Sequence, residues 1–324
     1  MPPAAAPALV VAVVGPTATG KSDLGIALAL ALGGEVVNTD AMQLYRGMDI
    51  GTAKVPVAER HGVPHHLLDV LDPAQDASVA DYQGWARSAL VDLEARGRRA
   101  VAVGGSGLYV RALLDHLEFP GTDATVRARL EARVEAEGSR ALHEELRAVD
   151  PVAAAAIGPR NARRIVRALE VIAVTGRPYS AALPQHVDEV PAVRIGLDCD
   201  RSTLDERVAT RVERMWAQGL VGEVDQLVAR GLGRTASRAV GYAQVLAMRA
   251  GTMSQAEAFA STVAATRRLA RKQMGWFGRD PRVHWLDARD PDLVERALDL
   301  VTRADAGTLE VPSGQPEARR SLGS

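Results

Sequence analysis

Cysteine is almost absent from this sequence, in which Cys199 is the only one among 324 residues. A disulfide framework within the chain is therefore excluded, and so is a zinc site built from several cysteines. Such low use of cysteine is typical of a reducing compartment, and we expect a cytoplasmic protein.

Long apolar runs are also missing. No stretch approaches the ~20 consecutive apolar residues that a membrane-spanning helix requires. The segment Met1–Pro7 lacks the basic residue that precedes the apolar run of a signal peptide. We therefore expect neither a targeting segment nor a membrane partner.

The sequence has no excess of charge of either sign. Its 39 basic and 40 acidic residues give a formal net charge of −1, so no global basic field marks a nucleic-acid-binding protein. Any surface that binds RNA must be local. A hydrophobic content of 47% and a charged content of 24% are ordinary for a globular enzyme with one large domain or two modest ones.

A phosphate-binding loop is the clearest motif. The apolar run Leu9–Val14 predicts a buried strand, the segment Asp23–Leu32 predicts a helix, and Gly-x4-Gly-Lys-Ser lies between them. Glycines let backbone N–H groups converge on an anion, the helix N-terminus and the lysine add positive charge, and the serine hydroxyl can bind Mg²⁺. We predict a diphosphate or triphosphate site, with Ser22 as metal ligand, formed by Gly15, Pro16, Thr17, Ala18, Thr19, Gly20, Lys21 and Ser22.

An acidic residue is expected beside this loop. The segment Glu35–Asp40 predicts a second strand that ends on Asp40. Since chemistry in open α/β sheets gathers at the carboxyl ends of the strands, Asp40 is favoured as a site residue over a solvated aspartate at a turn. The third predicted strand, Ala100–Val103, ends in glycines where hydrolytic P-loop enzymes commonly have an acid. This pattern favours a small-molecule group transferase over a motor or a GTPase.

The predicted fold class is α/β, with a P-loop NTPase-like parallel sheet core and a helical insertion domain. Residues 119–190 contain consecutive helical segments without a strand between them, and strands resume at Val193–Asp198. We therefore expect the core at 1–118 and 191–305, the insertion at 119–190 and a disordered tail at 306–324.

Basic residues cluster in the insertion and on two later helices. Four arginines occur in eight residues that contain no acid, which favours a phosphate-backbone contact over an exposed helix start: Arg160, Arg163, Arg164 and Arg167. On the predicted helix Thr203–Gln218, three arginines share one face and either pair with nearby acids or close over a diphosphate: Arg207, Arg211 and Arg214. The predicted helix Ser254–Phe277 joins a basic face to aromatic residues, which suits looped RNA better than a solvated surface.

Seven motifs in this order resemble those of the tRNA dimethylallyltransferases, also called isopentenyl-diphosphate:tRNA transferases. The resemblance covers roughly residues 9–288 and consists of GPTATGKS (15–22), NTDAMQLYRGMDIGTAK (38–54), PHHLLD (64–69), VGGSGLY (103–109), RRIVRALEV (163–171), AVGYAQ (239–244) and RKQMGWF (271–277). Two positions depart from the family pattern. Ala41 stands where serine is common and lacks a hydroxyl that could touch RNA, and Ser106 stands where threonine is common.

The resemblance implies transfer of a dimethylallyl group from dimethylallyl diphosphate to the exocyclic N6 amine of the adenosine 3′-adjacent to a tRNA anticodon. Diphosphate is released and no ATP is consumed. The loop would hold the diphosphate with Mg²⁺ as cofactor. Asp40, Thr17 and Arg211 would be the catalytic residues, with Asp40 accepting the proton of the amine.

The resemblance also implies the residues that contact tRNA, while the insertion would clasp the anticodon stem-loop of the RNA. These residues are Asp40, Ala41, Met42, Gln43, Ser106, Arg127, Arg163, Arg164, Ile165, Val166, Arg167, Arg238, Gly241, Tyr242, Arg271, Lys272 and Trp276. We expect a monomer. Three alternatives stay open: a prenyltransferase acting on free adenylate, which would not need such an insertion; a small-molecule kinase; and a non-enzymatic RNA-binding protein.

Overall fold

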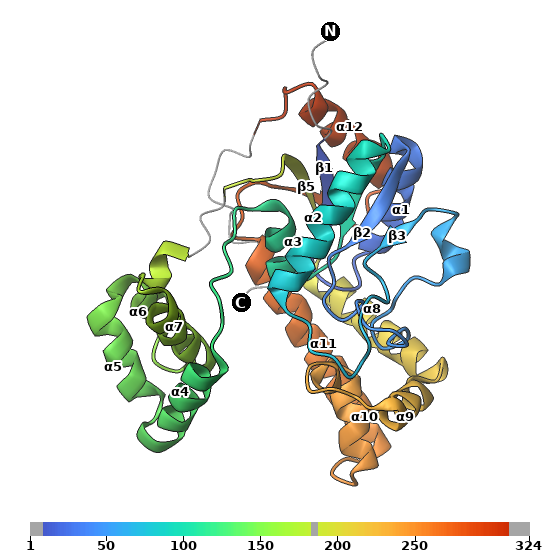
Figure 1. Cartoon of the computed structure of the whole chain (residues 1–324). Coiled ribbons are helices and arrows are strands. Elements are labelled where there is room, and N and C mark those ends of the chain that lie inside the picture. Colours follow the sequence, from blue (N-terminus) through green and yellow to red (C-terminus); the bar gives the residue numbers. More distant parts are fainter. Residues whose placement is uncertain (1–8, 183–186, 311–324) are drawn as a thin grey trace. The chain divides into compact units, whose positions relative to one another are not determined.

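Six parallel strands form the centre of the protein. The structure, a computed structural model, describes residues 9–182 and 187–310. The strands lie side by side in the order β3-β2-β4-β1-β5-β6, and each neighbouring pair is parallel. Figure 1 labels β1, β2, β3 and β5 of this sheet. Their bounds are β1 Val10–Val14, β2 Gly34–Asn38, β3 His65–His66, β4 Arg99–Val103, β5 Ala192–Asp198 and β6 Val283–Asp287. β1 and most of β5 are buried, as expected for a parallel sheet covered on both faces.

Helices connect the strands and cover the sheet. The apolar sides of α1 and α12 pack on a core around Val11, Val101 and Ile195, while α8, α9, α10 and α11 pack against one another. A short 3₁₀ helix occurs at Val57–Arg60 and another at Ala236–Arg238. The helices of this unit are α1 Lys21–Leu32, α2 Val79–Ala95, α3 Gly107–Leu114, α8 Arg201–Ala217, α9 Leu220–Arg230, α10 Tyr242–Arg249, α11 Gln255–Phe277 and α12 Leu293–Asp305.

Residues Asp115–Val187 form a second compact unit. The apolar faces of its helices meet around Leu142 and Ile165, and Asp123 and Asp150 accept hydrogen bonds from the first turns of α4 and α6. Such capping explains where these helices begin. The helical segments are α4 Ala124–Glu137, α5 Ser139–Val149, α6 Pro151–Ile157, α7 Ala162–Thr175 and a 3₁₀ helix at Tyr179–Ala182.

The chain enters and leaves this second unit through two paired connections. On the side of the sheet, the carbonyl oxygen of Leu114 accepts hydrogen bonds from the N–H groups of Glu189 and Val190, at 2.9 Å and 3.0 Å. On the side of the insertion, the N–H of His116 donates to the carbonyl oxygen of Val187 at 2.9 Å. The two connections therefore run side by side.

The predicted α/β class is confirmed, and so are the predicted strands, although β2 ends at Asn38, before Asp40. Neither α3 nor α9 is predicted from the sequence, because glycines surround or interrupt both segments. The insertion is predicted at 119–190, and the compact unit in the structure spans Asp115–Val187. The predicted tail falls largely on residues 311–324, outside the described part of the chain. Within 9–182 and 187–310, each helix is too short or too polar to cross a membrane.

Candidate active site

A cavity of about 1370 Å³ lies at the carboxyl ends of the strands. Its walls come from the phosphate-binding loop after β1, from Asp40 and the loop that follows it, from Gly104 and Gly105 after β4, and from α8. Because parallel strands end at one edge of the sheet, residues far apart in the chain meet here. Lys21 and Arg211 line the same cavity as Asp40, so cations and a carboxylate share one space.

The phosphate-binding loop has the backbone of an anion site. Gly15 and Gly20 have φ angles of 129° and 88°, and a Cβ on Gly15 would lie 2.5 Å from the carbonyl oxygen of Leu197. Gly20 precedes α1 without a side-chain cap, so no capping side chain occupies the first N–H groups of the helix. Lys21 folds back over the loop, with Nζ 2.6 Å from the carbonyl oxygen of Pro16.

Thr17 is held by two helices. Its N–H donates to Oε1 of Gln273 on α11 at 2.8 Å, and its Oγ1 accepts from Nη1 of Arg211 on α8 at 2.6 Å. The structure thus brings together Thr17 and Arg211, two of the expected catalytic residues. Gln273 also packs on Gly105, where a Cβ would lie 2.2 Å from its Nε2. No local sequence pattern identifies Gln273 as a partner of Thr17. It lies within a stretch expected to face RNA.

Burial lowers the pKa of both cations in this site. Burial, followed by the charge of Arg211, lowers the pKa of Lys21 to about 7, against an opposing effect of Asp40. Burial also lowers the pKa of Arg211, although Asp40 opposes that shift. A bound anion would relieve the repulsion between the two cations and favour their charged forms. The site is therefore suited to a polyanion such as a diphosphate.

The position of Asp40 is set by its neighbours. The N–H of Asp40 donates to Oδ1 of Asn38 at 2.8 Å, and Nδ2 of Asn38 donates to the carbonyl oxygen of Asp40 at 3.0 Å. The carboxylate accepts the N–H of Met42 at 2.9 Å. Burial raises the pKa of Asp40, although this hydrogen bond and the charges of Lys21 and Arg211 oppose the shift. A raised pKa makes this carboxylate a stronger base.

The start of α1 fits a magnesium ion that is held mainly by water and substrate. Ser22 is half-buried there and lines the cavity. In the described part of the chain, no group of three or more His, Cys, Asp or Glu side chains could hold a metal. Mg²⁺ commonly keeps several waters and takes one or two protein ligands together with phosphate oxygens, so a single hydroxyl beside an anion site suits it. Ser22 remains a predicted ligand.

The predicted tRNA contacts after Asp40 lie in and beside the cavity. The N–H of Ala41 donates to Oγ of Ser106 at 3.1 Å, so the two positions that depart from the family pattern touch each other. Met42 is half-buried. Gln43 lines the cavity, and its Nε2 donates to the carbonyl oxygen of Thr52 at 3.1 Å.

Four other predicted contacts of this unit reach the surface. Arg238 and Lys272 are exposed, and Arg271 is half-buried. Trp276 is 36% exposed, and its indole packs over Gly107, where a Cβ would lie 2.0 Å from the ring. Cations and an aromatic edge are therefore accessible to a nucleic acid.

Tyr242 and Gly241, by contrast, are buried. The hydroxyl of Tyr242 donates to Oε1 of Glu223 at 2.6 Å, and its ring lies against Gly51, where a Cβ would come within 2.4 Å. This position assigns the ring of Tyr242 to internal packing behind the loop that follows Asp40.

In the insertion, the predicted tRNA contacts fall into accessible and buried residues. Arg163 and Arg164 are exposed in the first turn of α7. Ile165 and Val166, which follow them, are buried in the core of the unit. Of these four residues, only the two arginines offer side chains to a partner.

Arg127 and Arg167 both bind the buried carboxylate of Glu170. Nη2 of Arg127 lies 2.9 Å from Oε2 of Glu170, Nη1 of Arg167 lies 3.0 Å from the same oxygen, and the N–H of Asp123 donates to Oε1 at 2.9 Å. Burial would raise the pKa of Glu170, but these hydrogen bonds outweigh it and lower that pKa. Two arginines implied as tRNA contacts therefore have a structural role within the insertion.

Family models and curated relatives agree on the class of protein. The family model described as IPP transferase matches residues 43–280, and that described as isopentenyl transferase matches residues 8–70. A tRNA dimethylallyltransferase of Thermobifida fusca (strain YX) is 60% identical over 299 residues, which cover 90% of this chain and 94% of that protein. One from Streptomyces coelicolor is also 60% identical over 299 residues, covering 91% and 96% of the two chains.

Solved structures show the same relationship. The full-length tRNA isopentenylpyrophosphate transferase from Bacillus halodurans is 40% identical, with a TM-score of 0.68 over 94% of this chain and 98% of that chain. A eukaryotic dimethylallyltransferase, 23% identical with a TM-score of 0.82, shares the fold over 95% of this chain and 82% of its own. With its phosphate-binding loop, Asp40 in the same cavity and this degree of identity, the chain belongs to the IPP transferase family, the tRNA dimethylallyltransferases.

Proposed function

We propose that this protein transfers a dimethylallyl group from dimethylallyl diphosphate to the exocyclic N6 amine of the adenosine immediately 3′ of the anticodon in tRNA. The proposal rests above all on the one cavity that holds both a cationic phosphate-binding loop and the carboxylate of Asp40. A loop that holds a diphosphate beside a half-buried base suits attack on carbon with diphosphate as the leaving group. The relatives described above are named tRNA dimethylallyltransferases, which supports a dimethylallyl transfer to tRNA.

On the donor side, the loop N–H groups, Lys21 and Arg211 bind the diphosphate. The bond between C1 of the dimethylallyl group and the diphosphate oxygen breaks, and both electrons stay on that oxygen. Ser22 would hold Mg²⁺, and the ion, when bound, would supply further positive charge at the leaving group. The cations of the protein are in place before the reaction, so they stabilise the growing charge without reorganisation.

On the acceptor side, the lone pair of N6 forms the new bond to C1. An aryl amine becomes acidic only as this bond forms, and Asp40 accepts the proton that the nitrogen loses. Its backbone is fixed by Asn38, and its raised pKa strengthens it as a base. Holding both reactants in line can supply about 7–11 kcal/mol of the barrier.

Accessible basic and aromatic side chains support tRNA as the acceptor. Arg163, Arg164 and Lys272 can contact phosphates, and the exposed edge of Trp276 can stack on an unpaired base. Free adenylate would need no such surface, which is why we favour tRNA. We propose that the protein acts as a monomer in the cytoplasm.

The test is mass spectrometry of nucleosides from unmodified tRNA incubated with the protein, Mg²⁺ and dimethylallyl diphosphate. Parallel reactions contain AMP in place of tRNA, or ATP with small acceptors. We expect the mass of one dimethylallyl group on an adenosine of tRNA, with none on AMP. Prenylation of AMP alone would move the acceptor to free nucleotide, and ATP turnover without prenylation would refute the proposed reaction.

A further inference from the structure

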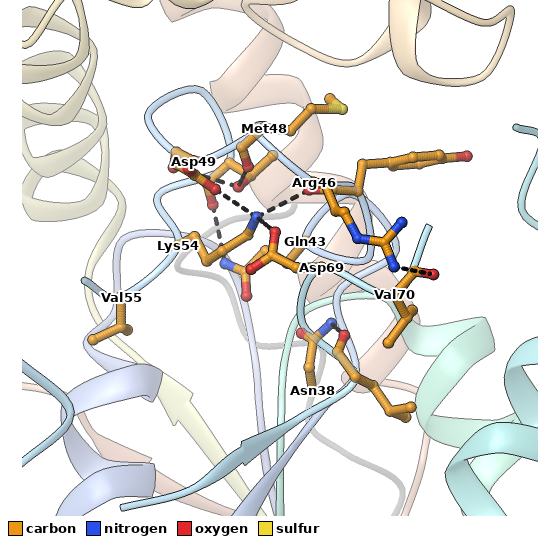
Figure 2. A network of polar contacts seen from close by, with 12 residues as sticks. Asn38, Gln43, Arg46, Met48, Asp49, Lys54, Val55, Asp69 and Val70 are labelled. Carbon is orange, nitrogen blue, oxygen red and sulfur yellow. Dashed lines mark hydrogen bonds and ion pairs between the residues drawn. The ribbon is translucent and has the colours of Figure 1, made fainter. Parts of the chain in front are cut away.

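We infer that Lys54 is a positioning residue that sets the place of Asp40 and Gln43 in the reaction, a role that rests on the proposed function. Its side chain is only 3% exposed, and Nζ donates to Oδ1 of Asp49 at 2.6 Å, to Oδ1 of Asp69 at 2.6 Å and to the carbonyl oxygen of Tyr45 at 3.0 Å (Figure 2).

An ammonium group has three N–H donors, and protein acceptors use all three in Lys54. Lys54 forms part of the cavity wall, yet this geometry leaves it no donor for a substrate. Its effect on the reaction must therefore pass through the residues that it holds.

The three acceptors of Lys54 come from two stretches of chain. Tyr45 and Asp49 lie on the loop that follows Asp40, and Asp69 lies on a neighbouring segment. Main-chain hydrogen bonds join the same stretches: the N–H of Asp69 donates to the carbonyl oxygen of Gln43 at 3.3 Å, and the N–H of Leu71 donates to that of Leu44 at 2.9 Å. Lys54 thus joins two parts of the loop that follows Asp40 to each other, and it joins this loop to residues 67–71.

The side chain of Gln43 is bound by the two residues that precede Lys54. Its Nε2 donates to the carbonyl oxygens of Thr52 and Ala53, at 3.1 Å and 3.4 Å, and these are the two residues before Lys54. A displacement of Lys54 would therefore move the acceptors of the Gln43 carboxamide.

Asp40 depends on the neighbouring segment through Asn38. Nδ2 of Asn38 donates to the carbonyl oxygens of both Asp40 and Leu67, each at 3.0 Å. Leu67 and Asp69 have φ angles of 62° and 58°, which residues other than glycine rarely adopt. Such a backbone persists only where its surroundings fix it, and the ion pair with Lys54 is one of those constraints.

A second anchor keeps the loop from collapsing when Lys54 is lost. The carboxylate of Glu223 on α9 accepts the N–H groups of Asp49, Ile50 and Gly51, at 3.0 Å, 2.7 Å and 3.1 Å. We therefore expect a variant without the ammonium to fold with a displaced or more mobile wall beside Asp40.

The experiment compares Lys54→Met with Arg46→Met. Arg46 is an exposed cation of the same loop, whose Nη2 lies 3.4 Å from the carbonyl oxygen of Val70 (Figure 2). For Lys54→Met we expect kcat for tRNA prenylation to fall by roughly 10- to 100-fold, since a misplacement of about 1 Å can cost that much. KM for dimethylallyl diphosphate should change little, because the phosphate-binding loop is untouched. Arg46→Met should keep the kcat of the parent protein.

Amide hydrogen exchange without substrates provides an independent readout. We expect faster exchange in residues 41–54 and 64–72 of Lys54→Met and unchanged exchange in the phosphate-binding loop. Unchanged exchange, or a kcat that falls only in proportion to the unfolded fraction, would overturn the inference.

If Lys54→Met fails to fold, Asp69→Asn keeps the shape of the partner side chain and weakens the same ion pair, and it should show both effects to a smaller degree. If the parent protein does not prenylate tRNA, the proposed function is refuted. The hydrogen-exchange result still decides whether Lys54 holds the loop in place.

Discussion

We expect the affinity for dimethylallyl diphosphate to depend on pH above neutrality, because the charge state of Lys21 changes there. Burial and then the charge of Arg211 lower the pKa of Lys21 to about 7 in the free protein. A diphosphate beside the amine favours the ammonium form and raises the pKa in the complex. Binding therefore takes up a proton wherever Lys21 is neutral in the free protein.

The magnitude follows from that pKa. About half of the free protein carries a charged Lys21 at pH 7 and about 1% at pH 9, so the affinity should fall roughly 50-fold across this range if the complex stays protonated. The terminal phosphate of the donor ionises near pH 6 and contributes little above pH 7. For folding the sign is opposite: between about 7 and 10.5 the unfolded chain binds more protons at Lys21, so stability rises with pH there.

Isothermal titration calorimetry without tRNA measures this effect, because the donor is not consumed. Titrations at constant Mg²⁺ in two buffers of different ionisation enthalpy give both the affinity and the proton uptake. Lys21→Arg keeps a charged group at all these pH values and should remove the dependence, whereas Asp40→Asn should retain it. A parent affinity that stays constant from pH 7 to pH 9, without proton uptake, would refute the argument that burial discharges Lys21.

Three other expectations concern the base, the RNA surface and the insertion. Asp40→Ala should lower kcat by roughly 10²–10⁴-fold with donor affinity retained, and an unchanged single-turnover rate would remove Asp40 from the chemistry. Arg164→Ala should weaken tRNA binding and reduce the slope of log K against log salt by about one, whereas a slope equal to that of the parent would contradict a phosphate contact. Glu170→Gln should destabilise the insertion by about 1–3 kcal/mol in urea denaturation, because the ion pairs of Arg127 and Arg167 are lost. Since the pKa of Glu170 lies below 4.5 in the folded state, the stabilisation is present above pH 4.5 and should be lost as the pH falls further; a difference independent of pH would count against it.

The sheet was predictable because its strands are short apolar runs with recognisable loops after them. The phosphate-binding loop was predictable because glycine positions and the helix that follows dictate its geometry, and Asp40 because topology alone brings strand ends together. The partner of Thr17 was not, since Gln273 lies 256 positions away and only tertiary packing joins them. The pairing of Arg167 did leave a signal, because Glu170 follows it by three residues on the same helix.

The paired connections at Leu114 and Val187 have an evolutionary consequence. Because entry and exit lie within hydrogen-bond reach of each other, a whole module can be added to or removed from the catalytic unit without rerouting any strand. A short turn could replace residues 117–186 and leave the sheet topology intact. The insertion can therefore diverge at its own pace, while the unit that carries the phosphate-binding loop has to change little.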